Sequence, residues 1–206
     1  MQKGGGFVKQ NYQLLTDAII RENRGRTPSL LLHACCAPCA SYVLEYLTEF
    51  FSVTLLFYNP NIQPEEEYRT RFQELERLCS LLKTKHPVKI LPCEYDPAVF
   101  DTLAKGLEDE PERGARCPKC FEARLRKTAT VAKENGFDYF TTTLSVSPHK
   151  NADTLHEIGT RLADEYAVSY LPADFKKRGG YLRSIELSNE FSLYRQNYCG
   201  CKFSKR

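Results

Sequence analysis

Short apolar runs alternate with stretches of helical periodicity along this chain of 206 residues. The apolar runs predict strands at residues 29–33, 52–58, 88–91, 138–142 and 167–171. The amphipathic patterns predict helices at residues 7–24, 38–50, 64–85, 96–107, 117–135 and 151–165. Strands that alternate with helices form α/β folds with a largely parallel sheet. Beyond residue 171 the pattern is lost, and we expect an irregular, basic C-terminal segment.

The length of the chain suits one sizeable domain with a terminal appendage. We expect an N-terminal helical extension over residues 1–28 and a single α/β catalytic domain over residues 29–206. No apolar run approaches the roughly 20 residues that cross a bilayer, and the N-terminus lacks the apolar stretch of a signal peptide. We therefore expect no membrane contact and a cytoplasmic, reducing location, in which cysteines serve as ligands or catalytic thiols rather than structural disulfides.

Positive charge is concentrated at the two ends of the chain. Residues 1–40 carry five basic and two acidic side chains, and residues 171–206 carry eight basic and three acidic ones. The middle carries −5, because the whole chain is +3 and the two ends together account for +8. Basic ends of this kind suit a phosphate backbone, and Lys176, Lys177 and Arg178 form a basic loop that is able to contact one. A solvated surface with surplus lysine explains the charge alone equally well.

Seven of the nine cysteines fall into three close groups. These are Cys35-Cys36-Ala-Pro-Cys39, Cys117-Pro-Lys-Cys120 and Cys199-Gly-Cys201. Clustered thiolates suit iron–sulfur clusters, zinc or redox disulfides. In a parallel sheet, binding sites form beyond the carboxyl ends of the strands. Side chains at or just past the predicted strand ends should therefore share one rim; they are Cys35, Cys36, Asn59, Cys93, Ser147 and Asp174.

The spacing of the cysteines leaves several chemistries open. Cys36 and Cys39 stand between a strand and a helix, as in a thioredoxin-like disulfide oxidoreductase, although the adjacent Cys35 and the second pair argue against that class. Two Cys-x-x-Cys pairs would also fill a tetrahedral zinc site, but structural zinc pairs are usually about 15–20 residues apart. A 4Fe–4S cluster takes thiolates from separate loops. Cys199 and Cys201 suit a strained, easily reduced disulfide or a further pair of metal ligands.

The order and spacing of six segments of the chain resemble those of the QueH-type epoxyqueuosine reductases of tRNA queuosine biosynthesis. They span nearly the whole chain apart from its first 28 residues. The segments are His33-Ala-Cys-Cys-Ala-Pro-Cys39, Tyr58-Asn-Pro-Asn-Ile62 with Glu67-Tyr68, Cys93-Glu-Tyr-Asp96, Arg116-Cys-Pro-Lys-Cys120, Thr141-Thr-Thr-Leu144 with Ser147-Pro-His-Lys-Asn151, and Arg195-Gln-Asn-Tyr-Cys-Gly-Cys201.

The resemblance implies a three-layer, Rossmann-like fold similar to the HUP and PP-loop domains. It also implies reduction of epoxyqueuosine to queuosine at the wobble position of tRNA. Matched residue by residue, the ligands of a 4Fe–4S cluster are Cys35, Cys36, Cys117 and Cys120, and the redox-active pair is Cys199 and Cys201. Cys39 is a candidate ligand for a second metal ion beside the cluster. The alternatives are a zinc-stabilised RNA-binding module and a thioredoxin-like oxidoreductase.

Loss of the epoxide oxygen requires a proton donor or a Lewis acid. The candidates for contacting substrate or donating this proton are Asp96, His149, Lys150 and Asp174, with Tyr95 as a further donor. An RNA base is expected to stack on Tyr58, Tyr181 or Tyr198, with phosphates on Lys176, Lys177 and Arg178. The expected partners are tRNA that carries epoxyqueuosine and an electron donor of the ferredoxin or flavodoxin kind.

Overall fold

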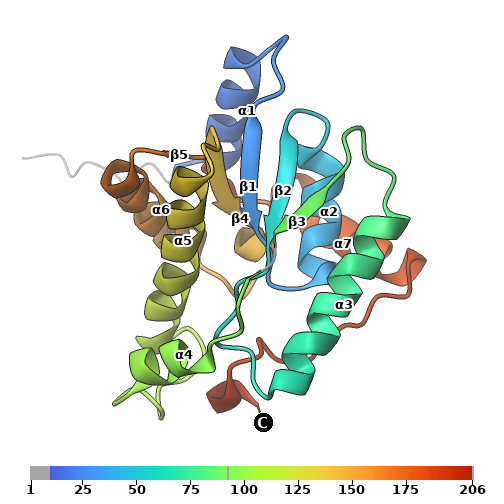
Figure 1. Cartoon of the computed structure of the whole chain (residues 1–206). Coiled ribbons are helices and arrows are strands. Elements are labelled where there is room, and N and C mark those ends of the chain that lie inside the picture. The colour runs from blue at the N-terminus through green and yellow to red at the C-terminus, as the bar shows by residue number, and fades with distance from the viewer. Residues whose placement is uncertain (1–9, 92, 206) are drawn as a thin grey trace, which may run out of the picture.

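A five-stranded, entirely parallel sheet forms the centre of the molecule, which was obtained as a computed structural model describing residues 10–91 and 93–205. The strand order is β3-β2-β1-β4-β5 (Figure 1). The strands are β1 (Ser29–His33), β2 (Ser52–Leu56), β3 (Lys89–Leu91), β4 (Tyr139–Thr142) and β5 (Ser169–Tyr170). The predicted parallel α/β fold is therefore confirmed.

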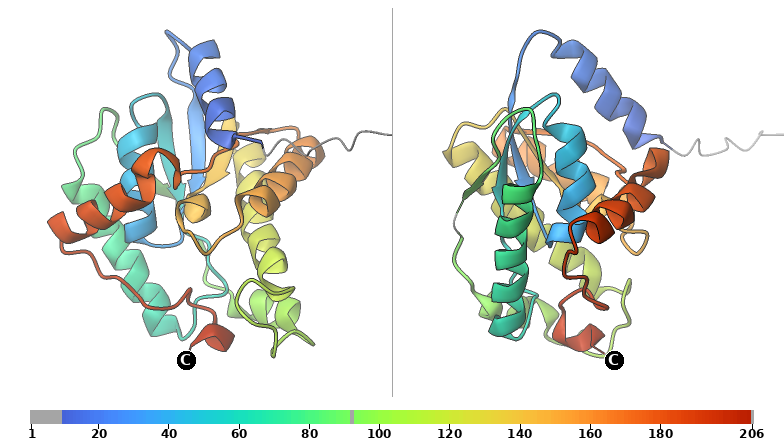
Figure 2. Two further views of the ribbon diagram at one scale, coloured as in Figure 1. Left: turned by 180° about the vertical axis from the view of Figure 1, so that it is seen from behind. Right: turned by 90° about the vertical axis from the view of Figure 1, so that its right-hand side faces the viewer.

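Helices cover both faces of this sheet. They are α1 (Tyr12–Glu22), α2 (Ala37–Leu47), α3 (Glu65–Leu81), α4 (Pro97–Ala104), α5 (Arg116–Glu134), α6 (Ala152–Tyr166) and α7 (Gly180–Glu190). Leu30 and Leu32 of β1 are buried with α2 and α3, whereas Leu31 between them is buried with α5 and α6. This alternation is the period of two expected for a strand buried on both faces, and it produces three layers. The right-hand view of Figure 2 shows α2 and α7 on the same side of the sheet.

Several predicted elements are longer than the observed ones; the helix predicted at residues 64–85, for example, ends at Leu81. Two segments differ further. The helix predicted at residues 7–24 is observed as α1, which begins after the N-cap Asn11, whose side chain accepts a hydrogen bond from the amide of Gln13 at 3.2 Å. Its predicted first residues, 7–9, lie outside the described residues. The C-terminal segment, predicted to be irregular from residue 172, contains α7. The buried face of α7 is partly polar, which hid its periodicity, because the Ser184 and Ser188 hydroxyls donate to carbonyl oxygens of their own helix.

The parallel strands all direct their following loops to one end of the sheet. His33 ends β1 just before the first cysteine group, Leu56 ends β2 before the turn at residues 57–62, and Thr142 ends β4 before a 3₁₀ turn, Thr143–Val146. The C-terminal segment after α7 returns to the same end of the molecule (Figure 1). In the described part of the chain, no helix combines the length and apolar character that a membrane span requires.

Candidate metal centre and active site

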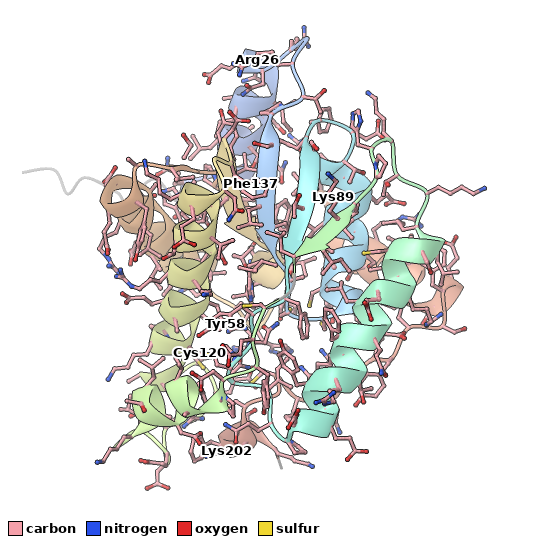
Figure 3. The ribbon with its side chains drawn as sticks, viewed as in Figure 1. Arg26, Tyr58, Lys89, Cys120, Phe137 and Lys202 are labelled. Carbon is pink, nitrogen blue, oxygen red and sulfur yellow. The ribbon has the colours of Figure 1, made fainter. Side chains whose placement is uncertain are left out.

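A cavity of about 650 Å³ lies beyond the carboxyl ends of the strands, and all three cysteine groups open into it. Its lining includes Cys35, Cys36, Cys39, Cys117, Cys120, Cys199 and Cys201. Figure 3 shows Cys120, in the first turns of α5, and Lys202, near the C-terminus, at this end of the molecule. The structure therefore places all three cysteine groups around one cavity, as the sequence predicted.

The first group forms a compact trio of sulfur atoms at the start of α2. The Sγ atoms of Cys35, Cys36 and Cys39 all lie within 4.8 Å of one another, and Cys35 and Cys36 are 3.8 Å apart. Hydrogen bonds from the Cys36 and Cys39 thiols hold the pKa of Cys35 well below its usual range, and the Thr143 hydroxyl, 3.6 Å away, adds to the effect. The same contact raises the pKa of Cys36 to about 12. One thiolate supported by two thiols is a donor set that a metal ion can deprotonate further.

The second group lies in the first turns of α5, on the opposite wall. The backbone amide of Arg113 donates to Cys117 Sγ at 3.3 Å. Cys120 is buried, which raises the pKa of its thiol, and it packs with Phe100 and Cys201. Because Cys117 and Cys120 are three residues apart on a helix, their side chains point to the same side. These two sulfur atoms are thus directed toward the cavity from an element far in sequence from the first group.

The third group, Cys199 and Cys201, lines the cavity from the C-terminal segment that follows α7. A hydrogen bond from the Cys201 thiol lowers the pKa of Cys199 to about 5; burial opposes this shift, and the nearby Lys150 ammonium supports it. The Ser204 hydroxyl lies 3.1 Å from Cys199 Sγ. The same sulfur–sulfur contact raises the pKa of Cys201. The pair therefore consists of a stabilised thiolate beside a thiol, the arrangement of a reactive dithiol.

Buried cations face the sulfur atoms. Arg116 and Arg124 are 2% and 4% exposed, and neither has a carboxylate partner within the residues that the structure covers. Arg116 Nη1 donates to the carbonyl oxygens of Leu107 and Glu108 at 2.6 and 3.0 Å, and Arg124 Nε donates to that of Cys120 at 3.2 Å. A buried cation is unfavourable unless an anion compensates it. Both side chains line the cavity, so thiolates or an anionic group inside it supply the compensation.

Sequence comparisons identify the family of this chain. A family model described as epoxyqueuosine reductase QueH matches residues 30–206. The epoxyqueuosine reductase QueH of Streptococcus pyogenes is 44% identical over 202 residues, which covers 96% of this chain and 79% of that protein. The proteins of the same name from Staphylococcus epidermidis and Thermotoga maritima are 45% and 35% identical, over 95% and 85% of this chain and 85% and 90% of theirs. This chain belongs to the QueH family. It is therefore an oxidoreductase.

Two of the polar residues predicted for this QueH-family site line the cavity and two do not. His149 and Lys150 line it; His149 Nδ1 is 2.6 Å from Arg113 Nη2, and Lys150 Nζ bonds the Glu112 carboxylate at 2.9 Å. Asp96 instead caps α4 by accepting a hydrogen bond from the amide of Ala98 at 3.1 Å. Asp174 is buried in an ion pair with Lys176 at 2.6 Å. The lining that the structure describes includes neither aspartate.

The aromatic and basic residues predicted to contact RNA are also divided. Tyr181 and Tyr198 line the cavity, whereas the described lining does not include Tyr58, and the Tyr95 hydroxyl donates to the carbonyl oxygen of Ile62 at 2.9 Å. In the predicted basic loop, Lys176 pairs with Asp174 and Arg178 pairs with Asp17 of α1 at 2.5 Å. Lys177 is exposed. Two of the three predicted phosphate contacts are therefore already engaged in ion pairs of the protein's own.

Sequence reasoning missed three buried arginines that line this cavity, namely Arg71, Arg116 and Arg124. A signal for them was present. Arg116, Cys120 and Arg124 follow one another at four-residue spacing, which places them on one helix face, and Glu67 precedes Arg71 by the same interval. The sequence did not indicate which arginines on these highly charged helices are buried, because both helices also carry exposed charged side chains: arginine and glutamate on α3, and mainly lysine on α5.

The thiol of Cys199 should react with iodoacetamide in weakly acidic solution. In the reduced, metal-free protein, its alkylation rate should rise with pH to a half-maximum near pH 5, because its pKa is lowered to about 5 and the thiolate is the reactive form. Removing the largest cause of this shift in Cys201→Ala should move the half-maximum upward by about one unit or more. Peptide mass spectrometry measures each site separately. Cys79, whose pKa burial raises to about 11, is the internal control and should stay unmodified at pH 7. A Cys199 rate that still climbs steeply between pH 8 and 9 would contradict the assignment.

Proposed function

We propose that this protein reduces epoxyqueuosine to queuosine at the wobble position of tRNA. Its relatives in three organisms carry the name epoxyqueuosine reductase and match most of their own length and of this chain. The observation that carries the proposal is the opening of three separate cysteine groups into one cavity together with buried cations. The cavity of this QueH-family oxidoreductase thus contains both the thiols and the positive charge that electron transfer to a bound nucleoside requires.

The proposed cofactor is a 4Fe–4S cluster held by Cys35, Cys36, Cys117 and Cys120. The donor set fits such a group: all four sulfur atoms line the same cavity, and the thiolate character of Cys35 suits a metal ligand. Cys39, whose Sγ lies within 4.8 Å of Cys35 and Cys36, is the proposed ligand for a second metal ion beside it. A cluster bound there would supply electrons one at a time. Membership of an oxidoreductase family argues against a zinc module without catalysis.

The redox balance of the reaction suits a dithiol. Converting an epoxide to an alkene and water consumes two electrons and two protons. Oxidation of the Cys199 thiolate and the Cys201 thiol to a disulfide releases two electrons and one proton, and the second proton comes from the ammonium proposed below as the proton donor, so the pair is able to store the electrons of one turnover. An external donor of the ferredoxin or flavodoxin class is proposed to restore the dithiol with two electrons, while two protons are taken from water.

Lys150 is the proposed proton donor to the leaving oxygen, with His149 beside it. Burial lowers the pKa of Lys150, but the Cys199 thiolate and the Glu112 carboxylate outweigh burial and raise it, so the ammonium stays protonated. Both side chains line the cavity, unlike Asp96 and Asp174 in its described lining. Tyr181 and Tyr198 are proposed to stack on a base that is turned out of the anticodon loop into the cavity.

Turnover should depend on the terminal cysteine pair. We expect Cys199→Ser and Cys201→Ser each to lower the rate of epoxide reduction on epoxyqueuosine-containing tRNA by about 100-fold or more, about 2.7 kcal/mol of lost transition-state stabilisation, with reductant in excess. Chromatographic analysis of nucleosides after tRNA digestion measures the product. Cys79→Ser, which changes a helix cysteine away from the cavity, should retain the parent rate. Near-normal turnover by the Cys199→Ser/Cys201→Ser double variant would refute the assigned role.

Binding of tRNA should depend on salt and on the basic ends of the chain. We propose that Lys176, Lys177 and Arg178 contact phosphates, and Lys177, exposed, offers the cleanest test. Affinity should fall linearly on a log–log plot against salt concentration, and Lys177→Glu should weaken binding and reduce that slope by about one. Filter binding measures both quantities. Lys133→Glu, a charge reversal at an exposed position of α5, is the matched control. Equal affinity and slope for the two variants would remove this loop from the tRNA surface.

A further inference from the structure

The segment that carries Cys199 and Cys201 is fastened along one face of α3. Arg77 Nη2 donates to the Ser192 carbonyl oxygen at 2.9 Å. The Glu74 carboxylate accepts a hydrogen bond from the backbone amide of Tyr194 at 2.6 Å, and the Tyr194 hydroxyl donates one to the Glu67 carboxylate at 3.0 Å. Positions 67, 74 and 77, together with position 71 between them, are spaced so that one face of a helix presents them all. The C-terminal segment is therefore held in place before the cysteine pair is reached.

Arg71 makes the last of these contacts, directly at the cysteine pair. It is 2% exposed, and its Nε donates to the Glu67 carboxylate at 2.7 Å. Its two terminal nitrogens face the other way: Nη1 donates to the carbonyl oxygen of Cys199 and Nη2 to that of Tyr198, both at 3.3 Å. The guanidinium also lies over the Tyr198 ring, 5.2 Å from its centre. A planar, rigid donor fork of this kind fixes two consecutive peptide groups, which a lysine ammonium does not do.

The backbone of the Cys-Gly-Cys turn is also held by the loop that follows β2. The backbone amide of Gln63 donates to the Gly200 carbonyl oxygen at 3.0 Å, and Asn61 Nδ2 donates to that of Cys199 at 3.4 Å. Gly200 has φ +97°, and a Cβ at this position would lie 2.7 Å from Ile62 Cγ1 and 3.1 Å from Arg71 Nη1. The turn thus fits between α3 and this loop only with glycine at its centre.

Stability alone does not require an arginine here. A buried ion pair such as Arg71–Glu67 often contributes no more to stability than apolar side chains of similar volume. What the guanidinium adds is a fixed place for the peptide groups of Tyr198 and Cys199. In that place, Cys199 packs against the apolar cluster that holds Cys120 and Cys201.

We propose that Arg71 is a positioning residue for the redox pair: its guanidinium fork holds the Cys199–Cys201 turn so that the two sulfur atoms stay together on the Cys120 side of the cavity. The proposal rests on the redox role proposed above for this pair. Holding the two thiols in contact raises their effective concentration toward each other, which favours closing of the disulfide ring. Releasing the turn should therefore make ring closure less favourable and should slow turnover while tRNA binding is unchanged.

The test compares Arg71→Met, Arg71→Lys and a matched control, Arg69→Met. Arg69 forms an ion pair with Glu65 on the same helix at the same four-residue spacing, but that pair is exposed and does not touch the C-terminal segment. The holoenzyme is equilibrated with mixtures of reduced and oxidised glutathione. In this exchange, the Cys199 and Cys201 thiols and one glutathione disulfide give one protein disulfide and two glutathione thiols. The Cys199–Cys201 ring-closure constant is read by trapping and mass spectrometry, and kcat and KM are measured on epoxyqueuosine-containing tRNA.

Both Arg71 variants should lower the ring-closure constant about tenfold, which corresponds to about 30 mV for this two-electron couple, and should lower kcat with KM unchanged. Arg69→Met should match the parent protein in both measurements. Arg71→Lys retains the buried charge beside Glu67, so it reports on the fork itself even where Arg71→Met fails to fold. Parent-like values for Arg71→Lys would overturn the proposal. Ring closure needs no tRNA, so the change in the ring-closure constant can be measured whether or not the parent protein reduces the epoxide. Failure of the parent protein to reduce the epoxide would refute the proposed function rather than the role of Arg71.

Discussion

The parallel arrangement of the five strands is the constraint on which the site depends. Since all strands run the same way, the loops after β1, β2 and β4 emerge at one end, and α2 and α5 begin there. Two cysteine groups more than 70 residues apart therefore open into one cavity. The third group arrives by a different route, through α7 and the segment along α3. The sheet thus supplies two walls of the site, and the contacts of α3 supply the third.

Charge balance explains why the cavity suits sulfur chemistry. Arg116 and Arg124 are buried without carboxylate partners in the described chain, and Lys150 is buried beside Glu112. Such groups are unfavourable in a protein interior unless anions face them. Stabilised thiolates at Cys35 and Cys199 are anions of the required kind. A cavity built in this way favours deprotonated cysteines and an anionic cofactor or substrate over neutral apolar ligands.

The sequence predicted the strands and most of the helices, because apolar runs and helical periodicity alternate along the chain. Of the residues expected to share one rim, Cys35, Cys36 and Ser147 line the cavity, whereas its described lining does not include Asn59, Cys93 or Asp174. It did not predict α7, whose buried face uses serines that satisfy their own hydroxyls. Nor did it predict that Asp96 would serve as a helix cap or Asp174 as an ion-pair partner, because residues next to a strand end are equally suited to capping and to a site. The buried arginines escaped notice because burial of a charged residue depends on tertiary contacts that no local pattern records.

The central claim is that cysteines from separate elements share one metal centre, and metal analysis of anaerobically purified protein tests it most directly. The account predicts about four iron and four acid-labile sulfide per chain. It also predicts that Cys36→Ala at the start of α2 and Cys117→Ala at the start of α5 each remove the iron and its visible absorbance, whereas Cys79→Ala in α3 retains both. Colourless protein with one tightly bound zinc and no sulfide, or full iron content after Cys117→Ala, would contradict it.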